Sequence, residues 1–261
     1  MKKLVLALTA LAAFTGSALA ADMAPRTYSK APAPMPVAPS WTGFYIFGGV
    51  GGGLWDANTG YVNNVTGGCV VCINNKQGGD GWFGTVGAGY DWQFNNRWVA
   101  GILADGQFGS LKGSESIGAA VFDQKLKDTW AVGARIGYLV APNVLSYVNG
   151  GYTGSNWSGS TVFSSATGLP IGFHTNSFNG QGWFLGGGVE NNLDIFGITA
   201  PGWFMKTEYR GAYYSNQNLS LLADGTNVAS GFSSTFKPFV QTISTSLVYR
   251  FNWTGPVVAK Y

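Results

Sequence analysis

Hydrophobic and polar residues alternate along most of this chain with a period of two, which is typical of β-strands whose two faces differ. The alternation is clearest from Trp82 to Phe94, where aromatic and branched residues share one parity and small or polar residues share the other. We count eight such segments, with the weakest alternation in the first and the fifth. Strands are expected at about residues 42–55, 81–94, 98–109, 128–140, 144–153, 180–191, 203–214 and 239–251.

The connectors between these segments also alternate in length. Residues 95–97 and 141–143 form tight turns, residues 192–202 form a longer connector, and longer polar loops are expected at about residues 56–80, 110–127, 154–179 and 215–238. Short turns at one end and long loops at the other are typical of transmembrane β-barrels. The sequence therefore predicts an all-β fold, an eight-stranded antiparallel up-and-down transmembrane β-barrel over residues 41–251, with both termini on the periplasmic side.

Composition narrows the alternatives to this fold. Charged residues make up 10% of the chain, against roughly 25% in a soluble domain, so a soluble β-sandwich is disfavoured. Aromatic residues reach 15%, which argues against disorder. The mean hydropathy is only +0.09, and no run of about 20 apolar residues predicts a membrane helix.

The charges within the strands fall on the parity opposite to the aromatic residues. An Arg or Lys facing lipid at the bilayer midplane costs about 2–4 kcal/mol, so this parity should face the lumen. An eight-stranded interior is just wide enough to be filled by side chains, so we predict a plugged or very narrow lumen. The expected lumen network has four acidic and four basic residues: Asp91, Asp105, Arg135, Glu190, Lys206, Glu208, Arg210 and Arg250. Inward glycines should leave room for the long basic chains, at Gly87, Gly89, Gly133, Gly137, Gly186 and Gly188.

Aromatic spacing agrees with a membrane span. Trp82 and Trp92 share a face ten residues apart, which corresponds to roughly 25 Å along a tilted barrel. Trp203 and Tyr213 repeat this spacing. We expect aromatic girdles at the two membrane interfaces that include Trp82, Trp92, Trp98, Trp130, Trp183, Trp203, Tyr249 and Phe251.

The chain ends lie outside the predicted barrel. Residues 1–20 combine Lys2 and Lys3, a short apolar stretch and the small-residue site Ala18–Ala20, which indicates a secretory signal peptide. Residues 21–40 form a Pro-rich periplasmic leader, and residues 252–261 form a short C-terminal tail. Removal of the signal lowers the formal charge from +3 to +1, so the charge implies no nucleic-acid partner.

Two cysteines remain, Cys69 and Cys72, among Asn and Gly residues typical of a loop. A secreted chain meets an oxidising compartment, so a small loop disulfide is the first expectation and free thiols are the second. A zinc site would lack two of its ligands.

Several of these segments resemble the small porin-like outer-membrane barrels that are surface antigens of alpha-proteobacteria. The matching motifs include Trp41-Thr42-Gly43-Phe44-Tyr45, Gly87-Ala88-Gly89-Tyr90-Asp91-Trp92-Gln93, Gly186-Gly187-Gly188-Val189-Glu190, Lys206-Thr207-Glu208-Tyr209 and Val248-Tyr249-Arg250-Phe251. The last motif resembles the signal read by the barrel-assembly machinery, although here a tail follows it. Leu103 stands where an inward Glu would be expected. The resemblance implies the Gram-negative outer membrane, with its lipid and lipopolysaccharide, as the surroundings.

Candidate chemistry is sparse. The single histidine, His174, lies in a predicted extracellular loop near Ser164, Ser165 and Ser177, and a nucleophilic serine needs such a base within reach. No phosphate loop, metal cluster or nucleotide fingerprint is present, so no cofactor is expected. The first hypothesis is a non-enzymatic barrel that supports the envelope and presents loops to extracellular ligands of unknown identity. The alternatives are a narrow porin for small solutes and a lipid-modifying outer-membrane enzyme.

Overall fold

The computed structural model describes residues 40–198 and 200–251. The predicted signal peptide, the tail 252–261 and the leader up to residue 39 lie outside the described residues. The described part forms one antiparallel sheet with a short 3₁₀ helix, η1, at Leu193–Phe196. The strands are β1 (Gly43–Asn63), β2 (Cys69–Phe94), β3 (Trp98–Ile117), β4 (Ala120–Ala141), β5 (Val144–Trp157), β6 (Ser160–Ser164), β7 (Pro170–Thr175), β8 (Phe178–Asn192), β9 (Trp203–Tyr214), β10 (Gln217–Ala223) and β11 (Ala229–Arg250).

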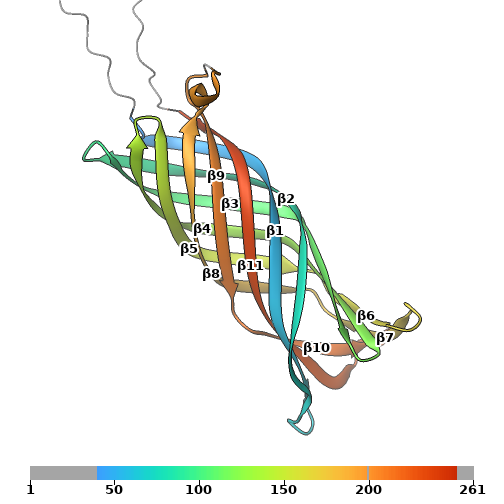
Figure 1. Ribbon diagram of the computed structural model, residues 1–261. Coiled ribbons are helices and arrows are strands. Elements are labelled where there is room, and N and C mark those ends of the chain that lie inside the picture. The colour runs from blue at the N-terminus through green and yellow to red at the C-terminus, as the bar shows by residue number, and fades with distance from the viewer. Residues whose placement is uncertain (1–39, 199, 252–261) are drawn as a thin grey trace, which may run out of the picture. The chain divides into compact units, whose positions relative to one another are not determined.

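The sheet closes on itself as a barrel (Figure 1). The closing pair is β1 with β11, from Tyr45 opposite Arg250 to Asn63 opposite Phe232. Each strand pairs with the next strand of the ring in the order β1, β2, β3, β4, β5, β8, β9 and β11. The predicted eight-stranded antiparallel barrel is therefore confirmed. Closure leaves no unpaired edge, which a sheet in lipid requires.

The strands are strongly staggered around the ring. Successive strand partners, followed once around the barrel from Ile46, lead to Asp56, ten residues farther along β1. With eight strands, this stagger corresponds to a tilt of about 40°, and the interior is only wide enough for side chains.

One end of the barrel carries short connections, and we call it the turn end. It holds residues 95–97, residues 142–143 and the connector with η1. Asn95 and Asn96 have φ of 48° and 58°, a left-handed conformation that asparagine tolerates better than most side chains. β1 begins and β11 ends at this same end.

The opposite end, which we call the hairpin end, differs from the prediction. β1 continues to Asn63 and β3 to Ile117, so segments expected as loops are mostly paired strands. β6, β7 and β10 lie together there (Figure 1), and β7 pairs with β10 through only two positions, Leu222 opposite His174 and Ala223 opposite Phe173. These strand extensions were not predicted, because they carry polar residues on both faces and so lack the alternation that is typical of the membrane segments.

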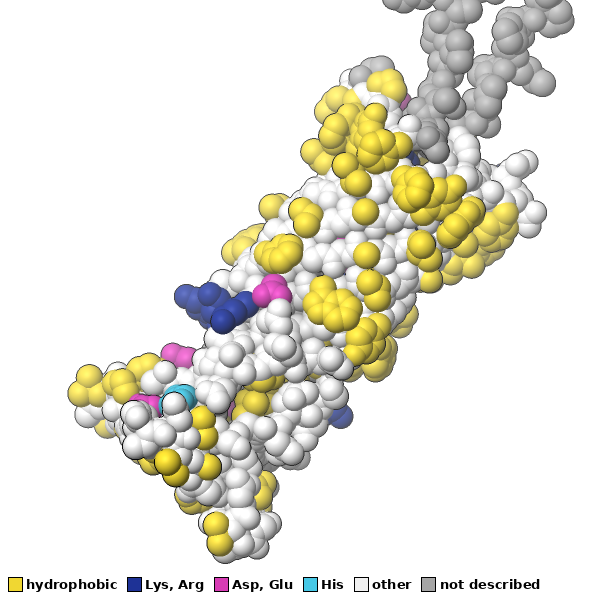
Figure 2. Space-filling view, turned by 180° about the vertical axis from the view of Figure 1, so that it is seen from behind, with side chains coloured by type: hydrophobic (Ala, Val, Ile, Leu, Met, Phe, Trp, Pro, Cys, Tyr) yellow, Lys and Arg dark blue, Asp and Glu magenta, His cyan; other side chains and the backbone are white. Residues whose placement is uncertain are grey.

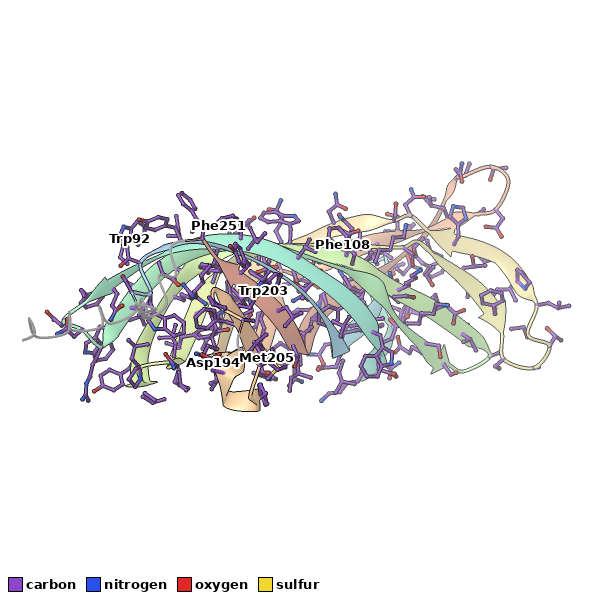
Figure 3. The ribbon with its side chains drawn as sticks, turned by 90° about the horizontal axis from the view of Figure 1, so that it is seen from above. Trp92, Phe108, Asp194, Trp203, Met205 and Phe251 are labelled. Carbon is purple, nitrogen blue, oxygen red and sulfur yellow. The ribbon has the colours of Figure 1, made fainter. Side chains whose placement is uncertain are left out.

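The outer face of the barrel is apolar. Trp82 is 79% exposed, and Trp92, Phe108 and Phe251 stand outside the wall (Figure 3). The eight predicted girdle residues all lie on this face. Seven of them are at least 41% exposed, the value for Trp203, and Tyr249 is half-buried. Trp183 stacks on Tyr213 towards the hairpin end, and Trp203 contacts Tyr249 at the turn end. The described residues contain no helix that is long and apolar enough to cross a membrane.

The interior contains two buried apolar clusters. The cluster at the turn end includes Trp41, Tyr45 and Phe204, and the cluster towards the hairpin end includes Trp55 and Trp157. Buried charged side chains lie among and between the two clusters.

Candidate functional site

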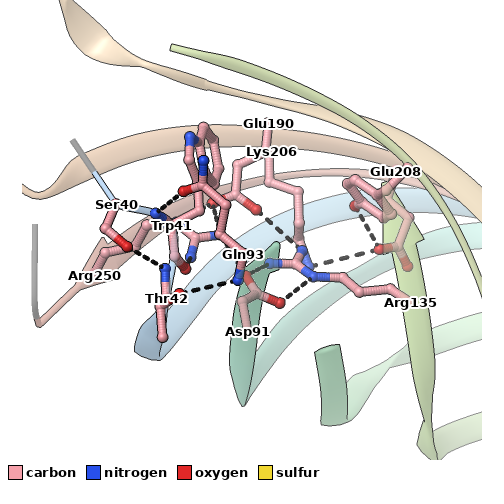
Figure 4. Close-up of polar contacts among 11 residues, drawn as sticks. Ser40, Trp41, Thr42, Asp91, Gln93, Arg135, Glu190, Lys206, Glu208 and Arg250 are labelled. Carbon is pink, nitrogen blue, oxygen red and sulfur yellow. Dashed lines mark hydrogen bonds and ion pairs between the residues drawn. The ribbon is translucent and has the colours of Figure 1, made fainter. Parts of the chain in front are cut away.

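Two arginines and two carboxylates form the first half of a buried charge network near the turn end (Figure 4). Arg135 donates to Asp91 through Nε at 2.9 Å and Nη2 at 2.5 Å, and to Glu190 through Nη1 at 3.1 Å. Arg250 donates through Nε to Glu190 at 2.8 Å, and its Nη2 is paired with Asp91 at 2.9 Å. The four side chains come from β2, β4, β8 and β11, so the group ties together opposite walls of the barrel.

The second half lies nearer the middle of the barrel. Arg210 donates to both oxygens of Asp105, at 2.9 and 2.7 Å, and to Glu208 at 2.8 Å. Lys206 pairs with the other oxygen of Glu208 at 3.7 Å. Asp105 and Arg210 come from β3 and β9, so this group also crosses the lumen.

Tyr147 joins the two halves. Its hydroxyl donates to Glu208 at 2.8 Å, and the Arg135 guanidinium stands 5.0 Å from its ring centroid. The eight charged residues predicted to face the lumen therefore form one continuous arrangement of four acids and four bases. Buried charge is tolerated only when it is paired in this way, because desolvation of an isolated ion costs several kcal/mol.

The cations also lie over aromatic rings. Arg250 stands 4.4 Å from the Trp41 ring, Arg135 is 4.4 Å from Tyr45, and Lys206 is 3.3 Å from Phe47. A desolvated cation over an aromatic face gains about 2 kcal/mol. These inward rings were not predicted, because aromatic residues were assigned to the lipid face.

Trp41 closes the turn end of the lumen. Its side chain is 1% exposed. Its backbone N–H donates to Oε1 of Gln93 at 2.8 Å, its ring N–H donates to the Pro142 carbonyl at 3.2 Å, and its carbonyl accepts from Arg250 at 3.2 Å. Trp41, two residues before β1, therefore fills the turn end and is hydrogen-bonded to three other segments.

The expected role of the inward glycines needs correction. They make room for aromatic rings and other inward side chains, rather than for the basic chains themselves. A Cβ at Gly87 would stand 2.5 Å from Cζ of Phe47, and one at Gly188 would stand 2.7 Å from the Tyr147 hydroxyl. Leu103, at the position where an inward Glu was expected, packs in the apolar cluster with Trp55.

A separate acidic site lies inside the hairpin end, beyond the aromatic band. Glu115 accepts hydrogen bonds from the Thr59 hydroxyl at 2.8 and 3.0 Å and from Tyr61 at 3.4 Å. Among the described residues it has no cationic partner within 4 Å. Burial therefore raises the pKa of Glu115. This residue was not predicted, because β3 was expected to end at residue 109.

The cysteine segment is also placed differently from the prediction. Cys69 begins β2, opposite Val62 of β1, instead of lying in a loop. Cys69 is disulfide-bonded. The side chain of Cys72 lies outside the described part of the structure.

His174 lies on β7 at the hairpin end and pairs with Asp224. Its Nδ1 stands 2.6 Å from Oδ1 of Asp224. Within the described ranges, no serine hydroxyl hydrogen-bonds to the ring of His174, and this includes the hydroxyls of Ser164, Ser165 and Ser177. The Ser165 hydroxyl donates to the Gly118 carbonyl instead. No group of three metal-ligating side chains occurs in the same ranges. The geometry is that of a partly exposed hydrogen-bonded pair between β7 and the turn after β10.

The closed eight-stranded ring, its apolar outer band and its paired interior charges define an outer-membrane β-barrel protein of Gram-negative bacteria. The chain belongs to the outer membrane protein beta-barrel domain family, which matches residues 6–251. It is 34% identical over 228 residues to the 31 kDa outer-membrane immunogenic protein of Brucella melitensis, and equally to that of Brucella suis. Each alignment covers 84% of this chain and 90% of the relative.

Solved outer-membrane proteins also match this chain, at low sequence identity. OprG of Pseudomonas aeruginosa superposes with a TM-score of 0.44 at 11% identity, over 80% of this chain and 97% of that one. The outer membrane protease OmpT of Escherichia coli gives a TM-score of 0.41 at 11% identity, over 84% and 100%.

Proposed function

We propose that this protein is a non-enzymatic structural barrel of the outer membrane, which supports the envelope and presents its hairpin end at the cell surface. The observation that carries this proposal is the filled interior. The charge network crosses the lumen twice, and Trp41 occupies the turn end. A wall cross-linked in this way resists deformation and leaves little space for solutes.

The orientation follows from the connections. Short turns face the periplasm in barrels of this type, so the hairpin end faces outward and both chain ends face the periplasm. Residues 1–20 would then direct secretion, residues 21–40 would form the leader, and 252–261 would form a periplasmic tail. The name of the Brucella relatives, an immunogenic outer-membrane protein, is consistent with a surface-exposed end.

The partners follow from this setting. Outer-membrane lipid and lipopolysaccharide would surround the aromatic band. The barrel-assembly machinery would insert the chain through the end of β11, at Tyr249 and Arg250, and the Phe251 that follows it. Cys69 and Cys72 would form a disulfide near the outer tip of the β1–β2 hairpin. No nucleic acid, metal or cofactor is part of the proposal.

Two measurements test the proposal. Purified protein in a planar lipid bilayer should show no stable conductance, whereas a steady open channel would favour a narrow porin. Cells that lack the protein should take up a hydrophobic dye faster, and the wild-type gene should restore the barrier. Dye uptake that is unchanged by the deletion would contradict a role in envelope integrity.

A further inference from the structure

The outer surface of the hairpin end carries a group of lysines that the charge network does not use. Lys112 of β3 lies directly opposite Lys125 of β4, and Lys127 follows on the same strand. Lys112 and Lys127 are exposed and Lys125 is half-buried. We call Lys112, Lys125 and Lys127 the lysine patch. Figure 2 shows a group of Lys or Arg side chains where the hydrophobic band ends, with an Asp or Glu side chain beside it.

The facing lysines form no close ion pair within the described part of the chain, although acids lie near them. Like charges directly opposite each other on neighbouring strands destabilise a sheet. Among the described residues, no carboxylate lies within 4 Å of any of the three ammonium groups. The nearest acids in the ladder are Asp80, which is opposite Lys112 on β2, and Asp123, two residues before Lys125. A third, Asp128, is held by the Asn156 amide.

The position of the patch relative to the membrane narrows the choice of ligand. Lys112 lies four residues beyond the lipid-facing Phe108, which corresponds to about 10 Å along the barrel axis. The apolar band of a barrel is about 25 Å tall, and lipid headgroups lie immediately beyond it. The ammonium groups therefore stand at the level of the headgroups of the outer leaflet.

The surface beside the lysines is hollowed. A depression of about 480 Å³ is lined by Lys112, Lys125, Ser114 and Asp123, together with Ser158 and Gly159 from the segment after β5. Hydroxyl and backbone groups next to two ammonium groups can bind the oxygens of a phosphate. A phosphorylated sugar headgroup matches this combination of charge and neighbouring polar groups.

We propose that the lysine patch binds the phosphates of a phosphorylated glycolipid headgroup in the outer leaflet. The inference rests on the proposed orientation and envelope role, and it names the surface through which the barrel would bind its surrounding lipid. The two facing lysines share the bound phosphate, which removes the repulsion between them, and the hollow receives the adjoining sugar.

Binding of bisphosphoryl lipid A to the full chain, folded in detergent and followed by native mass spectrometry, tests this proposal. The Lys112→Gln/Lys125→Gln variant should bind about 25-fold more weakly, at about fivefold per lysine. The matched control is Lys76→Gln/Lys237→Gln, which removes the same charge from two strands that flank Asn58. The control should change affinity less than threefold.

Two further arms identify the source of the phosphate. Dephosphorylated lipid A should bind the wild type as weakly as bisphosphoryl lipid A binds the double variant. Inorganic phosphate should displace lipid A only at a large molar excess. The proposal would be overturned if both double variants lost the same affinity for lipid A, or if the wild type bound dephosphorylated and bisphosphoryl lipid A equally well. Displacement of lipid A by equimolar phosphate would also overturn it. Heat-dependent gel mobility of each variant shows whether the barrel is folded, so loss of lipid binding is distinguished from loss of folding.

Discussion

The charges inside the aromatic band and the charges on the outside of the hairpin end follow opposite rules. Inside, all eight charged residues have an opposite charge within 4 Å, and each arginine and Lys206 also lies over a ring. Outside, Lys112 faces Lys125 with no such partner among the described residues. Burial makes an unpaired ion costly, whereas solvent and headgroups can compensate an exposed one. The paired charges therefore support the fold, whereas solvent and, in our proposal, lipid headgroups compensate the unpaired lysines.

The strongest test of this contrast removes one buried cation. Arg135→Gln leaves Asp91 and Glu190 to share Arg250 as their remaining cation, so the free energy of unfolding should fall by about 3–5 kcal/mol. Urea unfolding in lipid vesicles measures this loss. Lys112→Gln, the exposed control, should change stability by less than about 0.5 kcal/mol. Similar losses in the two variants would show that burial does not separate the two regions.

A second test places a new charge on the outer face at two depths. Ala88 is exposed on β2 within the apolar band, so Ala88→Arg should lower the free energy of unfolding by about 2–4 kcal/mol because the cation faces lipid. Ser114 is exposed beyond the band, so Ser114→Arg should be tolerated. Heat-dependent gel mobility and urea unfolding measure both variants. Comparable damage from Ser114→Arg would place the membrane boundary elsewhere.

A third test uses the buried acid of the hairpin end. Because the pKa of Glu115 is raised, the folded state holds its proton more tightly than the unfolded state does. Its favourable contribution is therefore complete below the ordinary pKa of about 4.5 and is lost as pH rises through the raised value.

Between pH 4 and pH 7, amide hydrogen exchange near Thr59 should accelerate more in the wild type than in Glu115→Gln, after correction for the intrinsic rate. The ring of strands within the aromatic band should show no such difference. An identical pH response in the two proteins would mean that Glu115 is not the titrating group.

The smallest expected effect concerns the His174–Asp224 pair. Both side chains are partly exposed, so His174→Gln should cost only about 0.2–1 kcal/mol and should loosen β7 from β10 without disturbing the barrel. Limited proteolysis of the hairpin end measures the loosening. The acyl composition of the envelope lipids should stay unchanged, and an altered composition would revive the lipid-modifying enzyme as an alternative.

Strand parity placed the charged residues without a structure because lipid imposes a simple rule on the outer face. Asp91, Glu190 and Arg250 stand out as the wrong residue type for lipid, whatever their partners are. The same rule failed for Tyr45, Phe47 and Tyr147, which point inward. These inward rings also explain why alternation was weak in the first and fifth strands. A ring suits both lipid and a cation-filled interior, so its type alone does not fix its direction.

The sequence by itself determined the number of strands in the barrel ring, the order of short and long connections, and the face on which each charge of those strands lies. These depend on local periodicity and on the cost of charge in lipid. Only the tertiary structure decided which acid pairs with which base, that Trp41 fills the turn end, and that Glu115 and the lysine patch belong to extended hairpins. These features depend on the stagger around the closed ring. It brings residues as distant in sequence as Trp41 and Arg250 into contact, and no local pattern encodes it.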